Sequence, residues 1–133
     1  MHKIEHLGLA VSDLSLSIKL WEALLGVPCY KTEAVETEGV ETAFFAVGDS
    51  KIELLQGTRP DSAITKFLAK KGEGFHHIAF AVEDIIAETA RLQAAGLEVL
   101  GDGKPRPGAD NKLVVFFHPR TAGGLLIELC QEA

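Results

Sequence analysis

The chain has 133 residues, a formal net charge of −6, 47% hydrophobic residues and 24% charged residues. This length and composition fit one compact folded domain and exclude a disordered chain, while the acidic balance argues against nucleic-acid binding. No apolar stretch approaches the roughly 20 residues that span a bilayer, and the N-terminus has no secretory pattern, so we expect a cytoplasmic protein without a membrane partner.

The first part of the chain predicts a strand, a helix and three more strands. Residues 3–11 form the strand, and Ser12 or Asp13 caps a helix whose apolar residues recur at helical spacing until Gly26 ends it. A strand near 29–33 follows, and then 43–47 and 51–55 form a hairpin. The two cysteines, Cys29 and Cys130, lie in apolar surroundings and are expected to be free thiols.

A middle helix begins after Ser62 and ends at Gly72. The pattern of the first part then repeats as a strand, a helix at about 84–95, a strand and a hairpin with arms 113–118 and 125–130. Residues 101–112 are rich in glycine and proline and predict a long loop, which in so small a domain is often functional.

The repeat is visible in the sequence itself. IEHLGLAVSDL, which begins at Ile4, aligns without a gap to FHHIAFAVEDI, which begins at Phe75, and KIELL further on matches LIELC. Each copy therefore supplies one histidine and one glutamate, namely His6 with Glu53 and His77 with Glu128.

This duplication predicts an α+β fold made of two tandem βαβββ modules, with sheets curved around a shared metal-binding cleft. We expect a single domain over 1–133, with the first module at about 1–58, a connecting helix at about 61–72 and the second module at about 74–133.

The four repeated residues are the candidate metal ligands. A lone histidine on a strand is more often structural, but Glu53 and Glu128 each lie inside an apolar strand, where an unpaired carboxylate is costly to bury. Two imidazoles and two carboxylates form a divalent metal site whose open positions can polarise a carbonyl and stabilise an enolate. The alternative is a set that is kept for structure or that binds a ligand without metal.

The motifs IEHLGLAV, GDSKIELLQ, FHHIAFAV and LLIELCQ resemble the vicinal oxygen chelate superfamily. More narrowly, DSAITKFLAKKGEGFHHIAFAVEDI and FFHPRTAGGLLIELC resemble the methylmalonyl-CoA epimerase family, over essentially the whole chain. The resemblance implies that His6, Glu53, His77 and Glu128 bind a divalent ion (Co, Mn, Zn or Ni). Some family members have glutamine where Glu53 stands.

The resemblance also implies an activity and partners. The reaction would interconvert the (R) and (S) forms of methylmalonyl-CoA, in propionate metabolism, through a metal-stabilised enolate, with Glu128 as one acid/base group. The CoA thioester would be the small-molecule partner, and the chain would form a homodimer. Some members place the second acid/base glutamate at the position of Thr42, so Glu41 is the candidate here, although a one-residue shift on a strand reverses its face.

Other functions remain open on the sequence. A glyoxalase I-like lactoylglutathione lyase uses the same ligand pattern, but the His118-Pro119 turn and the HHIAFAV context favour the epimerase. A metal-free binding protein of the same fold would not need all four ligand positions. An extradiol dioxygenase would need two histidines and one carboxylate, which leaves Glu53 without a role.

Overall fold

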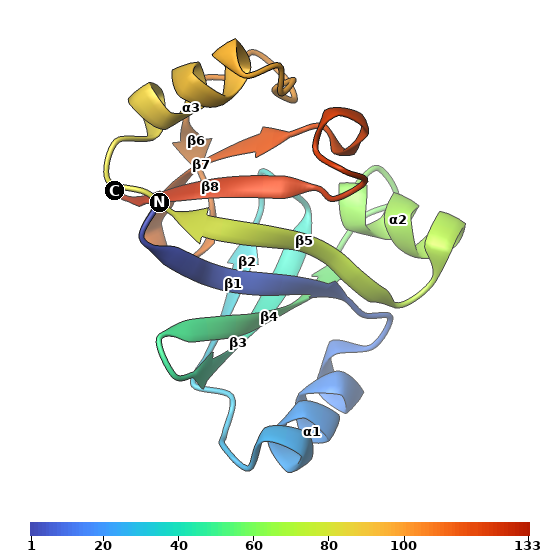
Figure 1. Cartoon of the computed structure of the whole chain (residues 1–133). Coiled ribbons are helices and arrows are strands. Elements are labelled where there is room, and N and C mark those ends of the chain that lie inside the picture. Colours follow the sequence, from blue (N-terminus) through green and yellow to red (C-terminus); the bar gives the residue numbers. More distant parts are fainter. The chain divides into compact units, whose positions relative to one another are not determined.

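The computed structural model describes residues 1–133 and contains eight strands, three α-helices and two short 3-10 turns (Figure 1). The chain divides into two compact units: the first unit is His6–His76, and the second unit is Met1–Glu5 together with His77–Ala133. The expected α+β class and the two βαβββ modules are confirmed. The curvature of the sheets around a shared cleft stays a prediction. None of the helices is both long and apolar enough to cross a membrane.

The first unit carries one strand–helix–three-strand module and a further helix. Its strands follow the order β2-β3-β4-β1, in which β1 and β4 are parallel and the other neighbours are antiparallel. The elements are β1 (Lys3–Ala10, which enters this unit at His6), α1 (Leu14–Leu25), β2 (Lys31–Val35), β3 (Val40–Val47), β4 (Ser50–Gly57) and α2 (Ala63–Lys71).

Helix α1 covers one face of this sheet. It begins where the Asp13 carboxylate accepts the amide of Leu16, and it ends at Gly26, whose φ of 70° is the left-handed conformation that glycine adopts without strain. Its inner stripe packs on a buried cluster from β3 and β4. The cluster contains Val11, Leu14, Ala43, Phe45 and Leu54, with Leu9, Ile18, Trp21, Leu25, Cys29 and Ile52 at its border.

Helix α2 covers one end of the opposite face. Its first turn is capped by the hydroxyl of Ser62, which accepts the amide of Thr65. Under it lies a second apolar cluster of Ala10, Val40, Leu55 and Ile64, bordered by Val35, Phe67 and Leu68. Successive strand residues alternate between the two faces of a sheet. Beyond the α2 cluster, the face opposite α1 therefore carries alternate side chains of β1, β3 and β4.

The second unit repeats the module. Its strands follow the order β5-β8-β7-β6, with β5 and β8 parallel. The elements are β5 (Gly74–Ala81, which enters this unit at His77), α3 (Ile85–Ala94), β6 (Arg106–Pro107), β7 (Lys112–Phe117) and β8 (Ile127–Glu132), with 3-10 turns at Ala109–Asn111 and Pro119–Thr121. Its core contains Val82, Ile85, Leu92, Val115, Phe117 and Leu129.

Each unit also repeats a hydrogen bond from the first amide of its helix to a glutamine on a strand. The side-chain oxygen of Gln56 on β4 accepts the amide of Leu14 at 2.6 Å, and that of Gln131 on β8 accepts the amide of Ile85 at 2.7 Å. In each unit, a strand that carries a candidate glutamate therefore also caps the helix of its own module.

Four sequence expectations need correction. The strand expected at 29–33 is β2, two residues later at Lys31–Val35, and the last strand is likewise later, at Ile127–Glu132. No continuous strand follows α3, since Val99 forms only an isolated bridge to Phe117. The loop expected at 101–112 instead contains β6 and a 3-10 turn. Pairing with a neighbouring strand, β3 for β2 and β7 for β6 and Val99, decides these elements rather than local pattern.

Candidate functional site

The first unit holds a buried histidine–glutamate pair. His6 on β1 places Nε2 3.2 Å from Oε1 of Glu53 on β4, and the two side chains are only 7% and 5% exposed. Both strands are parallel, and Glu53 pairs in register with Gly8, two residues after His6. His6 and Glu53 therefore share one face of the sheet, the face that α1 does not cover.

The second unit holds the same pair. His77 on β5 places Nε2 3.0 Å from Oε1 of Glu128 on β8, with exposures of 3% and 6%. Glu128 pairs in register with Ala79, again two residues after the histidine. The sequence repeat is thus also a repeat of geometry, down to the atoms that meet.

The two carboxylates have related but different surroundings. In each unit a phenylalanine lies directly opposite the glutamate on the antiparallel neighbour, Phe44 for Glu53 and Phe116 for Glu128. The Phe116 ring meets the His77 imidazole edge-on at 5.9 Å. Only Glu128 has a buried thiol beside it, because Cys130 Sγ donates to Oε2 at 3.2 Å.

The donor set of these pairs suits a divalent cation. Imidazole nitrogen and carboxylate oxygen are accepted by Zn, Co, Ni and Mn, and the aromatic neighbours keep water away from them. A buried ion pair without metal would explain each pair separately. It gives no reason why both units keep the same atoms at the same register.

Glu41 lies apart from the first pair. It is exposed, and it pairs across the sheet with Gln56, whose side chain reaches the first turn of α1. Glu41 therefore lies on the α1 side of the sheet, while Glu53 lies on the other side. Its role as an acid/base group stays a prediction.

Sequence reasoning missed a second carboxylate on the face of Glu53. Glu33 on β2 pairs with Thr42, and its side chain is 30% exposed. Lys31 Nζ lies 3.3 Å from Glu33 Oε1 and 5.9 Å from the centre of the Phe44 ring. The face of Glu33 follows from its pairing with Thr42 on β3, which the sequence of β2 alone does not reveal.

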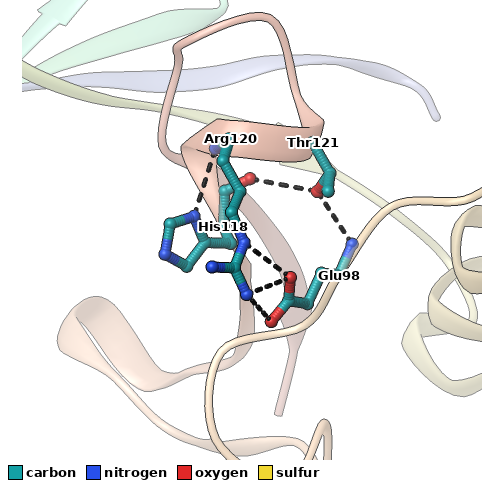
Figure 2. Close-up of polar contacts among 4 residues, drawn as sticks. All are labelled: Glu98, His118, Arg120 and Thr121. Carbon is teal, nitrogen blue, oxygen red and sulfur yellow. Dashed lines mark hydrogen bonds and ion pairs between the residues drawn. The ribbon is translucent and has the colours of Figure 1, made fainter.

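In the second unit, a polar clamp fixes the turn that leads from β7 to β8 (Figure 2). Arg120 donates three hydrogen bonds of 2.6 to 2.9 Å to the Glu98 carboxylate, and Thr121 Oγ1 accepts the Glu98 amide at 2.9 Å. His118 Nδ1 accepts the Arg120 amide at 3.1 Å. The hydrogen bonds from Arg120 hold the pKa of Glu98 below its ordinary value.

Comparison with known proteins identifies the family. The model of the Glyoxalase/Bleomycin resistance protein/Dioxygenase superfamily matches residues 5–116. The chain belongs to this superfamily. The sequence-based resemblance to it is therefore confirmed.

Within the superfamily, the chain is similar to two epimerases and, at lower identity, to a probable lactoylglutathione lyase. The ethylmalonyl-CoA/methylmalonyl-CoA epimerase of Cereibacter sphaeroides is 38% identical over 130 residues, which cover 97% of both chains. A Streptomyces coelicolor methylmalonyl-CoA epimerase variant in complex with 2-nitronate-propionyl-CoA is 38% identical, with a TM-score of 0.92 and coverage of 100% of this chain and 96% of that one. A probable lactoylglutathione lyase of Vibrio parahaemolyticus is 29% identical, covering 98% and 91%.

Proposed function

We propose that this chain is a metal-dependent methylmalonyl-CoA epimerase. The observation that carries the proposal is the buried histidine–glutamate pair that both units build at the same register, in a chain 38% identical to an epimerase of that name. The higher identity to the epimerases than to the lactoylglutathione lyase favours inversion of a CoA thioester over glyoxalase chemistry.

In this proposal His6, Glu53, His77 and Glu128 hold one divalent ion, of the Co, Mn, Zn or Ni type. When bound, the ion supplies Lewis-acid stabilisation of the negative charge that develops as the α-proton leaves. The imidazoles must be neutral at Nε2 and the carboxylates ionised to act as ligands, so proton uptake by these residues competes with metal binding.

The reaction also needs proton carriers on both sides of the α-carbon. Glu128 is the acid/base group on one side, and the Cys130 thiol holds its second oxygen in place. Phe116 and the buried strand around it keep the carboxylate away from bulk water. For the other side the sequence predicts Glu41, which lies on the α1 side of the sheet, away from the face of Glu53.

The test follows α-hydrogen exchange of methylmalonyl-CoA in deuterated water, beside metal analysis of the purified protein. We expect about one divalent ion per chain, and exchange that is lost in His77→Ala but kept in His2→Ala, whose side chain is half exposed. Methylglyoxal–glutathione turnover without exchange would replace the proposal with a lyase. Absence of metal together with tight CoA-thioester binding would replace it with a metal-free binding protein.

We also propose that the chain is a homodimer that pairs through α1. The outer side of this helix exposes Leu16, Leu20 and Leu24 by 64%, 62% and 65%. A stripe at i, i+4 and i+8 is self-complementary across a twofold axis at its centre, because Leu16 then faces the partner's Leu24 while Leu20 meets its own copy. Exposed apolar groups in such a row are typical of interaction sites.

Sedimentation of the purified chain tests the dimer. We expect Leu20→Glu to give a monomer, while Ile86→Glu, which changes an equally exposed residue on α3, leaves the dimer intact. A monomeric wild-type chain, or a dimer that survives Leu20→Glu, would show that α1 is not the interface.

The cytoplasm is the proposed location. Cys29 and Cys130 are not joined in a disulfide, as expected for a compartment that keeps thiols reduced. Cell fractionation with an antibody to the chain tests this placement.

A further inference from the structure

Inversion at the α-carbon requires a second proton carrier besides Glu128. The position in the first unit at which some family members carry this group holds no carboxylate. Thr42 stands where some family members carry that glutamate, and Thr42 is 1% exposed with its hydroxyl donating to the Glu33 carbonyl oxygen at 3.1 Å. A threonine hydroxyl titrates far above neutral pH, so Thr42 cannot serve as the base.

The register of the sheet places another carboxylate beside this position. Glu33 lies directly opposite Thr42, and Thr42 lies opposite Leu55, two residues from Glu53 on β4. Residues directly opposite one another share a face, so Glu33 and Glu53 project from the same side of the sheet. The contact of Lys31 with the Phe44 ring, which faces Glu53, agrees with this placement.

We propose that Glu33 is the second acid/base group of this enzyme. It supplies from β2 the carboxylate that some relatives supply from β3 at the position of Thr42. This inference rests on the proposed epimerase function and names the residue that completes it.

The spacing on this face leaves room for a substrate between Glu33 and the candidate ligand Glu53. Neighbouring strands lie about 4.8 Å apart and residues rise about 3.4 Å, so the Cα atoms of Glu33 and Glu53 are about 12 Å apart. A small acyl group held beside Glu53 therefore lies within reach of the Glu33 side chain, without contact between the two carboxylates. On β3, the family glutamate would stand one strand closer.

Glu33 is held in place from two directions. Lys31 pairs with its carboxylate at 3.3 Å. The turn after β2 is tied to the rest of the unit by Arg59, whose guanidinium donates to the carbonyl oxygens of Glu36 at 2.6 Å and Thr37 at 3.4 Å. An edge strand fixed in this way can position a catalytic carboxylate.

The proton balance is simple. The Glu33 carboxylate takes the α-proton from one epimer, and the C–H electron pair moves into the thioester carbonyl. Glu128, protonated on the carboxylate oxygen that does not serve as a ligand, then gives its proton to the opposite side of the same carbon, which restores the C–H bond with inverted configuration. Glu33 releases its proton to water and Glu128 regains one, while the reverse reaction exchanges the two roles.

Glu33→Gln is the variant that tests this role, with each pure epimer incubated separately in deuterated water. General acid–base groups contribute roughly 10²–10⁴-fold, so we expect epimerisation to fall by at least about 100-fold. Exchange should persist for one epimer, whose α-hydrogen faces Glu128, and stop for the other. Adding Thr42→Glu to this variant restores a carboxylate on the same face and should recover part of the lost rate.

Glu36→Gln is the matched control, because it removes an exposed carboxylate at the end of the same strand region. It should epimerise at the wild-type rate. If Glu33→Gln epimerises within about threefold of wild type, or loses exchange equally for both epimers, Glu33 is not the second carrier. If the wild-type chain itself exchanges neither epimer, the proposed function fails instead. A one-sided loss in Glu41→Gln alone would assign the role to Glu41.

Discussion

The two units present the same buried histidine–glutamate pair but differ at the edges of their sheets. In the first unit the edge strand β2 has five residues and places Glu33 opposite Thr42. In the second unit the edge strand β6 has two residues and places Arg106 opposite Val114. Thr42 and Val114 occupy equivalent register positions, since each lies two residues before the phenylalanine that faces the glutamate.

This difference separates a feature that both units share, the histidine–glutamate pair, from one that differs between them, the edge strand. The pair is the same in both units, as expected if both halves contribute to one task. At the equivalent register position one edge carries the Glu33 carboxylate, paired with Lys31, and the other carries the Arg106 guanidinium, as expected if each edge meets a different part of an asymmetric substrate. The Arg106 guanidinium lies 5.6 Å from the Phe116 ring, much as Lys31 lies over Phe44.

The largest expected effect tests whether the two pairs serve one ion. His6→Ala and His77→Ala change different units, yet a shared ion predicts that either substitution removes the same metal. Loss of groups that merely support a ligand costs 10- to 100-fold in affinity, so loss of a ligand should exceed about 100-fold. Elemental analysis after dialysis measures the stoichiometry. Half of the metal remaining in each variant would instead indicate separate sites.

An intermediate effect is expected at the edge of the second unit. Arg106→Ala removes an exposed cation that can attract the anionic substrate, so we expect KM to rise about tenfold with kcat nearly unchanged, equivalent to about 1.4 kcal/mol of uniform binding. Arg91→Ala removes an exposed guanidinium from α3 and is the control. Steady-state kinetics with a fall in kcat at constant KM would place Arg106 in the chemical step.

The smallest effect concerns the clamp of the second unit. Arg120 lowers the pKa of Glu98, so the pair stabilises the fold above the ordinary glutamate pKa, and this contribution disappears as the pH falls through the lowered value. Arg120→Gln should therefore lower Tm slightly at pH 7 and not at all in strong acid. Lys19→Gln, on α1, removes an equally positive charge without this pattern. A Tm difference independent of pH would contradict the assignment.

The sequence predicts much of this molecule because its signals are local. Asp13, Ser62 and Gly26 mark helix ends through their own side chains or backbone freedom, and the structure confirms all three. The pairing of each histidine with its glutamate is also predicted, because the repeat aligns them on equivalent strands.

The remaining features depend on how one strand pairs with its neighbour. Arg106 and Pro107 have no strand pattern of their own, and only the register with β7 makes them β6. The face on which Glu33 lies likewise follows only from the register of β2 with β3. A carboxylate whose role depends on a neighbouring strand cannot be recognised from its own segment.

The glutamine caps couple each ligand to a helix. Gln56 lies three residues after Glu53 and accepts the first amide of α1, and Gln131 lies three residues after Glu128 and accepts the first amide of α3. A redesign of the metal ligands that shifts β4 or β8 by a single residue would also uncap a helix. In each module, the position of the candidate metal ligand and the capping of the helix must therefore be engineered together.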